Sequence, residues 1–237
     1  MSETERLYRE QTGAVAYDEG LRKYMLGVYN YMALGIAGTA LVAFFFLTNQ
    51  AALQFALGLR FIPFIALIGL GFFAPKLIMS GSRGVAYGAY AAYVGLWGLL
   101  IGPIVATYVG IGLAGMVAQA FFITASLFMA MSLYGYTTKK DLSGWGRFLF
   151  MASVGLLIAI VVNFFLGSEL ISFLVSAAVV LVFSAITAYE TQMIRNLYQQ
   201  GAGEANERAA IFGAFALYGT FVTLFIHVLN LLSIMRD

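Results

Sequence analysis

Polar side chains near the end of the chain have the types and the spacing needed to handle a proton or a cation. Glu190 interrupts a long apolar stretch, and Thr220, Thr223, His227 and Asn230 follow at intervals of three, four and three residues. At 3.6 residues per turn, these four lie on one face of a helix. A carboxylate opposite such a face is a candidate for a proton-titrated gate or a transient calcium site.

Less specialised roles for Glu190 and His227 stay open. An ionised carboxylate at the centre of a membrane helix costs about 2.5–3.5 kcal/mol, and less near the interface, so Glu190 needs a partner, water or a proton. The alternative is an interfacial charge whose side chain extends toward water. His227, the only histidine, is either a titrating group or a hydrogen-bonded packing residue.

Further polar residues lie inside the apolar stretches. Such residues are suited to hydrogen bonds between membrane helices, and together they are also suited to lining a narrow hydrated path. They are Gln119, Ser126, Asn163, Ser184 and Thr187.

The elements that must position these groups are long and apolar. Hydrophobic residues make up 62% of the 237 positions, and a membrane-spanning helix needs about 20 apolar residues. The runs do not alternate between apolar and polar residues, as the strands of a membrane barrel would. We therefore predict an all-α integral membrane bundle of seven transmembrane helices, at residues 25–47, 59–79, 85–107, 111–134, 147–167, 170–193 and 208–233.

The second and third spans carry helix-modifying residues. Residues 51–59 are also apolar, so we expect the second helix to begin early, and Pro63 and Pro75 to kink or end it. Small residues in the third span let helices approach closely, within the bundle or, alternatively, across a homodimer. These residues are Gly84, Gly88, Gly95, Gly98 and Gly102.

Basic residues predict how the bundle is oriented. With these spans, all 13 lysines and arginines except Arg60 and Arg236 fall on the side of the N-terminus. Cytoplasmic loops retain Lys and Arg during insertion, so we predict a cytoplasmic N-terminus. The predicted organisation is a cytoplasmic tail over residues 1–24, followed by one seven-helix domain over residues 25–237.

The residue inventory argues against an enzyme. With no cysteine and one histidine, the chain lacks the ligand set of a zinc hydrolase. It has neither a Gly-x-Ser-x-Gly nucleophile elbow nor a phosphate-binding loop. A formal net charge of +2, with the basic residues in loops, gives no nucleic-acid signal. We expect no catalytic activity and no cofactor.

Four segments together suggest a family. Residues 132–143 contain Tyr-Gly-Tyr-Thr at positions 134–137, residues 189–194 read Tyr-Glu-Thr-Gln-Met-Ile, and residues 217–225 begin with Leu-Tyr. These segments resemble the fourth turn and the sixth- and seventh-helix motifs of the Bax inhibitor-1 family, also called the transmembrane Bax-inhibitor-motif family. Residues 98–105 resemble part of its third helix. The resemblance covers nearly the whole chain from about residue 20.

This resemblance implies a mechanism. In the family, two acidic residues on the last two helices share a proton and gate a pH-sensitive leak of cations, mainly calcium. Glu190 corresponds to the first acid, but Thr220 stands where the second is expected. Lys76 and Arg83 are the candidates for the basic residue that partners the pair in some relatives.

Two functions stay open. The first is channel-like passage of calcium or other cations, with Glu190 as the titratable group, Thr220 and Thr223 as neutral partners and Asp141 as a charge at the cytoplasmic mouth. The second is a non-conducting adaptor, similar to bacterial members that bind and restrain a membrane-bound quality-control protease. Both place the chain in the lipid bilayer of a bacterial cytoplasmic (inner) membrane.

Overall fold

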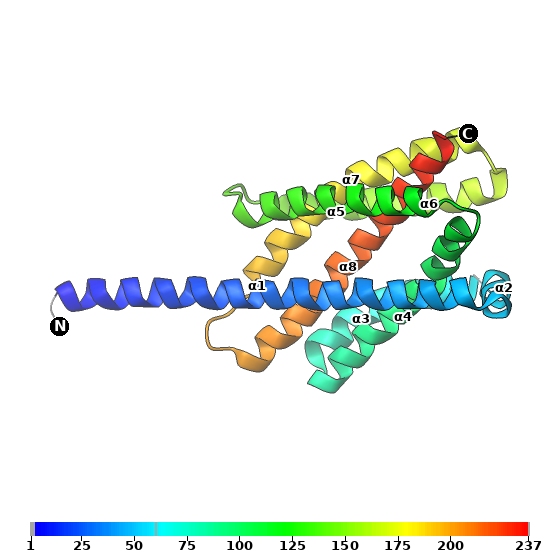
Figure 1. Cartoon of the computed structure of the whole chain (residues 1–237). Coiled ribbons are helices and arrows are strands. Elements are labelled where there is room, and N and C mark those ends of the chain that lie inside the picture. Colours follow the sequence, from blue (N-terminus) through cyan, green and yellow to red (C-terminus); the bar gives the residue numbers. More distant parts are fainter. Residues whose placement is uncertain (1–2, 60, 237) are drawn as a thin grey trace.

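A computed structural model describes residues 3–59 and 61–236, with side chains from residue 19 onward. All regular elements in this part of the chain are helices, so the predicted all-α class is confirmed. They are α1 (Glu3–Thr48), α2 (Gln50–Gly58), α3 (Phe61–Ser80), α4 (Arg83–Gly110), α5 (Ala114–Thr137), the 3-10 turn η1 (Ser143–Trp145), α6 (Gly146–Leu166), α7 (Glu169–Asn196) and α8 (Gly203–Ile234). Figure 1 shows them gathered into one bundle.

In the described part of the chain, seven helices are long and apolar enough to cross a membrane, which confirms the predicted number of spans. They coincide with the predicted segments to within a few residues at most ends. The first helix is longer than expected, because α1 begins at Glu3 and runs without interruption past the predicted boundary at residue 24. Residues 1 and 2 of the predicted tail lie outside the described residues.

The region before the second span differs from the expectation. Asn49 accepts a hydrogen bond from the Ala52 backbone N–H through Oδ1 at 2.9 Å, and this cap begins the separate short helix α2. The second span starts only at Phe61, so its helix does not begin early. Pro63 lies in its first turn, where proline is tolerated. Pro75 lies inside α3 and does not end it.

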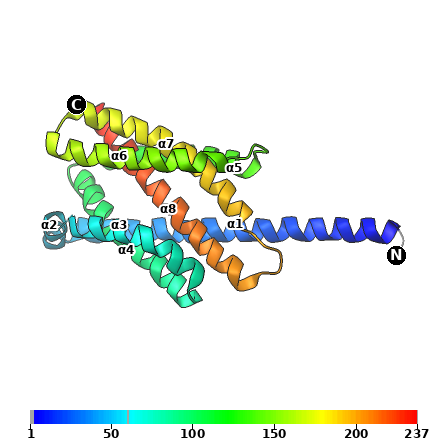
Figure 2. The ribbon, with the colours of Figure 1, turned by 180° about the vertical axis from the view of Figure 1, so that it is seen from behind.

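One helix occupies the centre of the bundle. In the most apolar window of α8, 78% of the residues are buried, whereas the figure for the α6 window is only 6%. Helix α8 contacts α1, α3, α4, α5 and α7, and α6 packs mainly against α7. Figures 1 and 2 show α8 crossing the interior obliquely in both views. The polar side chains of α8 are therefore held among other helices and away from lipid.

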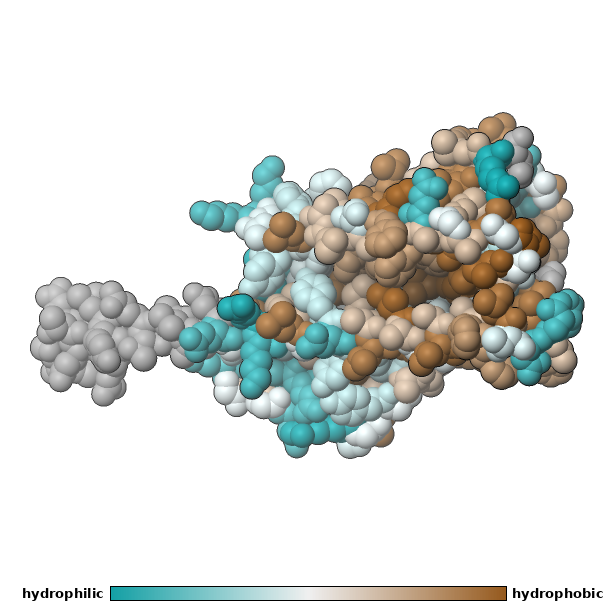
Figure 3. Space-filling view, in the orientation of Figure 1, coloured by the Kyte–Doolittle hydropathy of each residue, from teal (hydrophilic) through white to brown (hydrophobic). Residues whose placement is uncertain are grey.

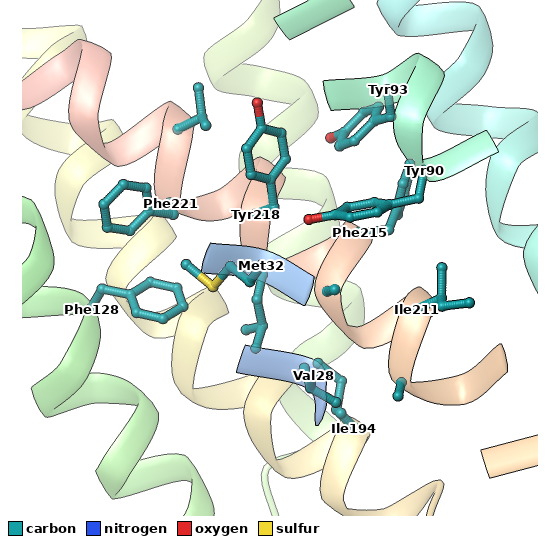
Figure 4. Close-up of a cluster of buried hydrophobic side chains, with 14 of the residues drawn as sticks. Val28, Met32, Tyr90, Tyr93, Phe128, Ile194, Ile211, Phe215, Tyr218 and Phe221 are labelled. Atoms are coloured by element: carbon teal, nitrogen blue, oxygen red, sulfur yellow. The ribbon is translucent and has the colours of Figure 1, made fainter. Parts of the chain in front are cut away.

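A cluster of buried apolar and aromatic side chains holds α8 in place. Figure 4 shows that the cluster draws on α1, α4, α5, α7 and α8. The Tyr93 ring lies 4.0 Å from the Phe215 ring and 5.9 Å from that of Tyr218, measured between centroids. Phe128 of α5 meets Phe221 at 5.5 Å, edge to face. Such ring pairs stabilise the packing by about 0.5–1.5 kcal/mol each beyond burial of their area.

The predicted close packing of the third-span glycines is confirmed at two positions. A β-carbon on Gly98 would press against Val42, and one on Gly102 against Phe46 and the Ala43 backbone, so α4 lies directly on α1. A β-carbon on Gly88 or Gly95 would meet no atom within 4 Å, and one on Gly84 would meet only the Ser82 hydroxyl, at 3.9 Å. Glycine therefore serves close helix approach in the second half of α4 only.

The two ends of the bundle differ in charge. We call the end at which α3 joins α4, α5 joins η1 and α7 joins α8 the basic end. There Arg83 pairs with Glu204 at 3.2 Å and with Glu207 at 3.0 Å, which ties the start of α4 to the start of α8. These are exposed ion pairs and contribute about 1 kcal/mol or less each. Arg60, assigned to the opposite end, lies outside the described residues. The cytoplasmic location of the basic end stays a prediction.

Candidate functional site

Glu190 and Thr220 meet between α7 and α8. The Thr220 hydroxyl donates a hydrogen bond to Glu190 Oε2 at 2.8 Å. Thr220 is buried and Glu190 is partly buried. In the described part of the chain, no ion pair involves Glu190. The carboxylate predicted to face helix seven does so, and its partner is a neutral hydroxyl.

The backbone at Gly219 brings a third polar group to this site. A β-carbon there would collide with the Tyr93 hydroxyl, so only glycine lets α4 approach α8 at this level. Tyr93 also interacts electrostatically with Glu190. Glu190 is thus bonded to the Thr220 hydroxyl of α8 and lies within electrostatic range of Tyr93 of α4. Both are uncharged groups that reorient their hydrogen bonds when a proton or cation arrives.

His227 and Asn230 form a separate polar cluster with α7. His227 Nδ1 lies 3.0 Å from the Ser176 hydroxyl, and Asn230 Nδ2 donates to Ser176 at 2.8 Å and to Ser172 at 3.0 Å. Ser176 precedes Glu190 by 14 residues, which is roughly 21 Å along a helix. The polar face predicted for helix seven therefore serves two sites at different depths.

Thr223 and the polar residues of α7 between these sites bond mainly to their own helices. The Thr223 hydroxyl donates to the Gly219 carbonyl at 2.9 Å, and Ser184 and Thr187 donate to carbonyls one turn earlier in α7. A hydroxyl in a helix commonly satisfies itself in this way. Thr223 therefore makes no hydrogen bond with Glu190.

The remaining polar residues of the spans do not gather into a path. Gln119 and Ser126 are exposed on α5, and the Ser126 hydroxyl donates to the Phe122 carbonyl. Asn163 Oδ1 accepts from the Ser168 backbone at the turn between α6 and α7. Asn163 thus shapes a turn rather than joining two helices.

Neither of the basic residues proposed as a partner for Glu190 pairs with it. Arg83 is engaged by Glu204 and Glu207 at the basic end, and Lys76 is exposed near the end of α3. The expected pairing of Glu190 with Lys76 or Arg83 is therefore not observed. Acidic residues at the start of α8 lie closer to Arg83 and satisfy it, which the linear order of the chain does not reveal.

The loop that carries Asp141 is attached to α7 by Gln192, a buried residue that sequence analysis does not single out. Gln192 Nε2 donates to the Lys140 carbonyl at 2.8 Å, and Gln192 Oε1 accepts from the Leu142 N–H at 2.7 Å. Arg195 donates to the Tyr136 carbonyl just before the loop. Gln192 lies two residues beyond Glu190, so the helix that carries the buried acid also holds the loop.

Asp141 is exposed at the outer side of this loop. Its Oδ1 accepts a hydrogen bond from the Ser143 backbone at 2.9 Å. Hydrogen bonds from Ser143 lower the pKa of Asp141 below its usual range. Because the ordinary value is about 3.9, this carboxylate stays ionised at neutral pH. It supplies a constant negative charge at the basic end.

A chain of hydroxyls links three helices near Glu190. Tyr29 of α1 lies 2.6 Å from the Ser132 hydroxyl of α5, which lies 3.0 Å from that of Thr191 in α7. Ser132 and Thr191 are buried. Next to them, a β-carbon on Gly135 would collide with the Ala188 backbone. The Ser132–Gly135 part of the predicted motif is therefore where α5 lies directly on α7.

Comparison with known proteins decides the family. The family described as inhibitor of apoptosis-promoting Bax1 matches residues 21–237. The chain belongs to this family. It is 38% identical to the inner membrane protein YbhL of Escherichia coli K12, over 90% of this chain and 92% of that protein. It is 36% identical to an uncharacterised protein of Rickettsia prowazekii, over 93% of each chain.

This Bax inhibitor-type chain is a multi-pass protein of the bacterial inner membrane, given its seven candidate spans and its likeness to YbhL. An uncharacterised membrane protein of Streptococcus pyogenes serotype M3 is 29% identical over 90% of this chain. The resemblance inferred from the motifs is thereby confirmed.

The described residues around Glu190 do not form a complete set of metal ligands. Among the described residues, no three His, Cys, Asp or Glu side chains form a group that could hold an ion. Stable calcium sites use six to eight oxygen ligands, several of them carboxylates. One carboxylate bonded to one hydroxyl falls short of that ligand set.

We expect Gln192→Leu to loosen the loop around Asp141. The substitution removes both hydrogen bonds that hold the Lys140 carbonyl and the Leu142 N–H, a local loss of about 1–3 kcal/mol. Backbone hydrogen exchange over residues 138–142, measured by mass spectrometry, should become about 5- to 150-fold faster. Gln199→Leu, at an exposed position, is the matched control. Unchanged exchange in Gln192→Leu would show that the loop does not depend on α7.

Proposed function

We propose that this protein is a pH-sensitive, channel-like leak for calcium or other cations, in which Glu190 is the titratable gate residue. The observation that carries the proposal is the hydrogen bond from Thr220 to Glu190 between α7 and the central helix α8. It places the carboxylate inside the bundle with no basic partner among the described residues.

The energetics of this carboxylate support a switch. A charged carboxylate at membrane depth is costly unless a partner offsets it. Around Glu190, α8 supplies the Thr220 hydroxyl and α4 the Tyr93 phenol. Neither carries a compensating positive charge at neutral pH. A proton or a cation must therefore neutralise the carboxylate, or entering water must solvate it. Exchange among these three states is the proposed gating step.

The surroundings of the site support a route to the basic end. Gln192 connects the Glu190 helix to the loop with Asp141. Asp141 stays ionised between about pH 5 and 8, because its pKa lies below the usual range. It attracts cations throughout this window but contributes no pH response there. A pH dependence between these limits therefore does not come from Asp141, and in this proposal it comes from Glu190.

The experiment is calcium uptake into liposomes reconstituted with the full chain, measured between about pH 5 and 8. We expect uptake above that of empty liposomes, and a dependence on pH that Glu190→Gln removes. The glutamine keeps the size of the side chain and its hydrogen bond with Thr220 while removing titration. His227→Gln is the matched control, since His227 is bonded to Ser176 in the other cluster, and it should leave the pH profile in place.

Three results would count against the leak or against Glu190 as its gate. Uptake no greater than in empty liposomes at every pH would favour the non-conducting adaptor for a membrane-bound protease, which is the alternative function. A pH profile unaltered by Glu190→Gln would exclude Glu190 as the gate. Loss of the profile in His227→Gln alone would move the titrating group to the Ser176 cluster.

A further inference from the structure

A groove follows the surface of the bundle between α1 and α5. Two cavities lie along it, of about 380 Å³ near the basic end and about 430 Å³ toward the opposite end. Its walls come from α1 and α5, and α8 supplies part of its floor. Figure 1 shows α8 between the α1 and α5 ribbons, and Figure 3 shows the brown, apolar surface recessed there.

The spacing of the lining residues shows that both cavities belong to one groove. On α1, the cavity near the basic end is lined at positions 22, 25, 26 and 29, and the second at 36, 39, 40 and 43. These positions continue one helical face. The α5 lining extends from Ala114 to Tyr136, roughly 33 Å at 1.5 Å per residue. This length matches the apolar thickness of a bilayer, about 30 Å.

An aromatic and methionine contact divides the groove near its middle. Met32, Phe128 and Phe221 point toward one another in Figure 4, and the Phe128 and Phe221 rings lie 5.5 Å apart. The half nearer the basic end is therefore a compartment about one bilayer leaflet deep. The size of this compartment suits a single lipid better than a helix of another protein.

The half nearer the basic end has its one charged lining residue at its mouth. Arg22 lies on its lining, in the first turns of the first span, and the Tyr29 hydroxyl is paired with Ser132 deeper in. Leu26, Met129 and Leu133 are more than half exposed along its walls. An arginine above an apolar slot is complementary to a molecule with an anionic head and a hydrocarbon tail.

We propose that this half of the groove binds an anionic phospholipid, with its phosphate on Arg22 and one acyl chain between α1 and α5. The other charged residues at the mouth also favour an anionic headgroup. Lys23 is exposed beside Arg22, and Lys139 and Lys140 are exposed in the loop after α5. Among the described residues of these two segments, the acidic ones are Glu19, one turn before Arg22, and Asp141. The basic groups outnumber them.

The site joins the lipid to the helix pair that carries Glu190. Ser132 lines the compartment and is hydrogen-bonded to Thr191, the residue after Glu190. An acyl chain in the groove lies against α5 at Leu133 and against α1 at Leu26. The bound lipid thereby fills the gap between α1 and α5, next to the linked hydroxyls of Tyr29, Ser132 and Thr191.

The test is native mass spectrometry of the full chain in detergent with added phosphatidylglycerol or phosphatidylcholine of identical acyl chains. The unaltered chain should bind phosphatidylglycerol more tightly. Arg22→Gln should weaken phosphatidylglycerol binding about fivefold, the contribution of one arginine toward an anionic lipid surface, and leave phosphatidylcholine binding unchanged. Leu133→Trp should weaken both lipids, because the indole fills the slot.

Matched controls come from α6, on another side of α7. Arg147→Gln removes an exposed arginine at the same end, and Leu166→Trp enlarges a leucine that is 63% exposed, as Leu133 is. Neither should alter binding. Equal binding of the two lipids, equal losses in Arg22→Gln and Arg147→Gln, or full binding in Leu133→Trp would each overturn the proposal.

Discussion

Thr220→Asp should give the protein a second pH-dependent transition, separated from the first. The Thr220 hydroxyl already lies 2.8 Å from Glu190 Oε2, so the new carboxylate would meet the existing one. Two like charges about 4 Å apart repel by about 4 kcal/mol at an effective dielectric constant of 20. The pair will therefore hold one shared proton over a wide pH range and titrate in two separated steps.

The measurement is infrared difference spectroscopy of the protonated carboxyl group, followed against pH together with calcium uptake. Thr220→Asn provides the uncharged control of similar shape. Thr223→Asp provides the positional control, because the Thr223 hydroxyl bonds to its own helix at Gly219 and not to Glu190. A paired titration in Thr223→Asp but not in Thr220→Asp would show that a different face of α8 meets the acid.

Gly135→Ala should strongly destabilise the bundle. The new β-carbon would collide with the carbonyl oxygen, carbonyl carbon and α-carbon of Ala188. These are backbone atoms, so no side-chain rotation relieves the clash, and α5 must move away from α7. We expect a loss of about 3 kcal/mol, the upper part of the range for overpacking.

The stability of both variants is measured by thermal unfolding in the same detergent. Gly155→Ala on α6 is the matched control, because a β-carbon there meets no atom within 4 Å. That control should be neutral or stabilised by up to about 1 kcal/mol through its better helix propensity. Gly135→Ala should also lose calcium uptake, since the Ser132–Thr191 bond crosses the same interface. Equal melting of the two variants would contradict the close contact of α5 and α7.

The sequence was sufficient for those features that depend on each segment alone. Insertion into lipid requires about 20 apolar residues with their backbone bonds satisfied internally, and this requirement is visible in each span separately. The match of residues 132–143 to the family motif likewise needed no contacts. Two features differ from the prediction. Helix α1 begins well before residue 25, and Asn49 caps a separate helix, α2, that apolar composition does not distinguish from the next span.

The candidate site was partly predictable. Glu190 was placed opposite a polar face of the last helix, since a lone carboxylate in an apolar run requires polar neighbours. Its bond to Thr220 agrees with that expectation. His227 is hydrogen-bonded to Ser176, and Arg83 forms ion pairs with Glu204 and Glu207. Both sets of contacts depend on how the helices are rotated and shifted relative to one another. Periodicity within one helix does not contain this information.

Only the tertiary structure decided which helix is central. Both α6 and α8 are apolar enough to span a membrane, yet 6% of the α6 window and 78% of the α8 window are buried. Lipid and protein interior are both apolar, so hydropathy does not separate a lipid-facing helix from a core helix. The packing of small residues and aromatic rings around α8 makes that choice, and it also leaves the groove between α1 and α5 open to lipid.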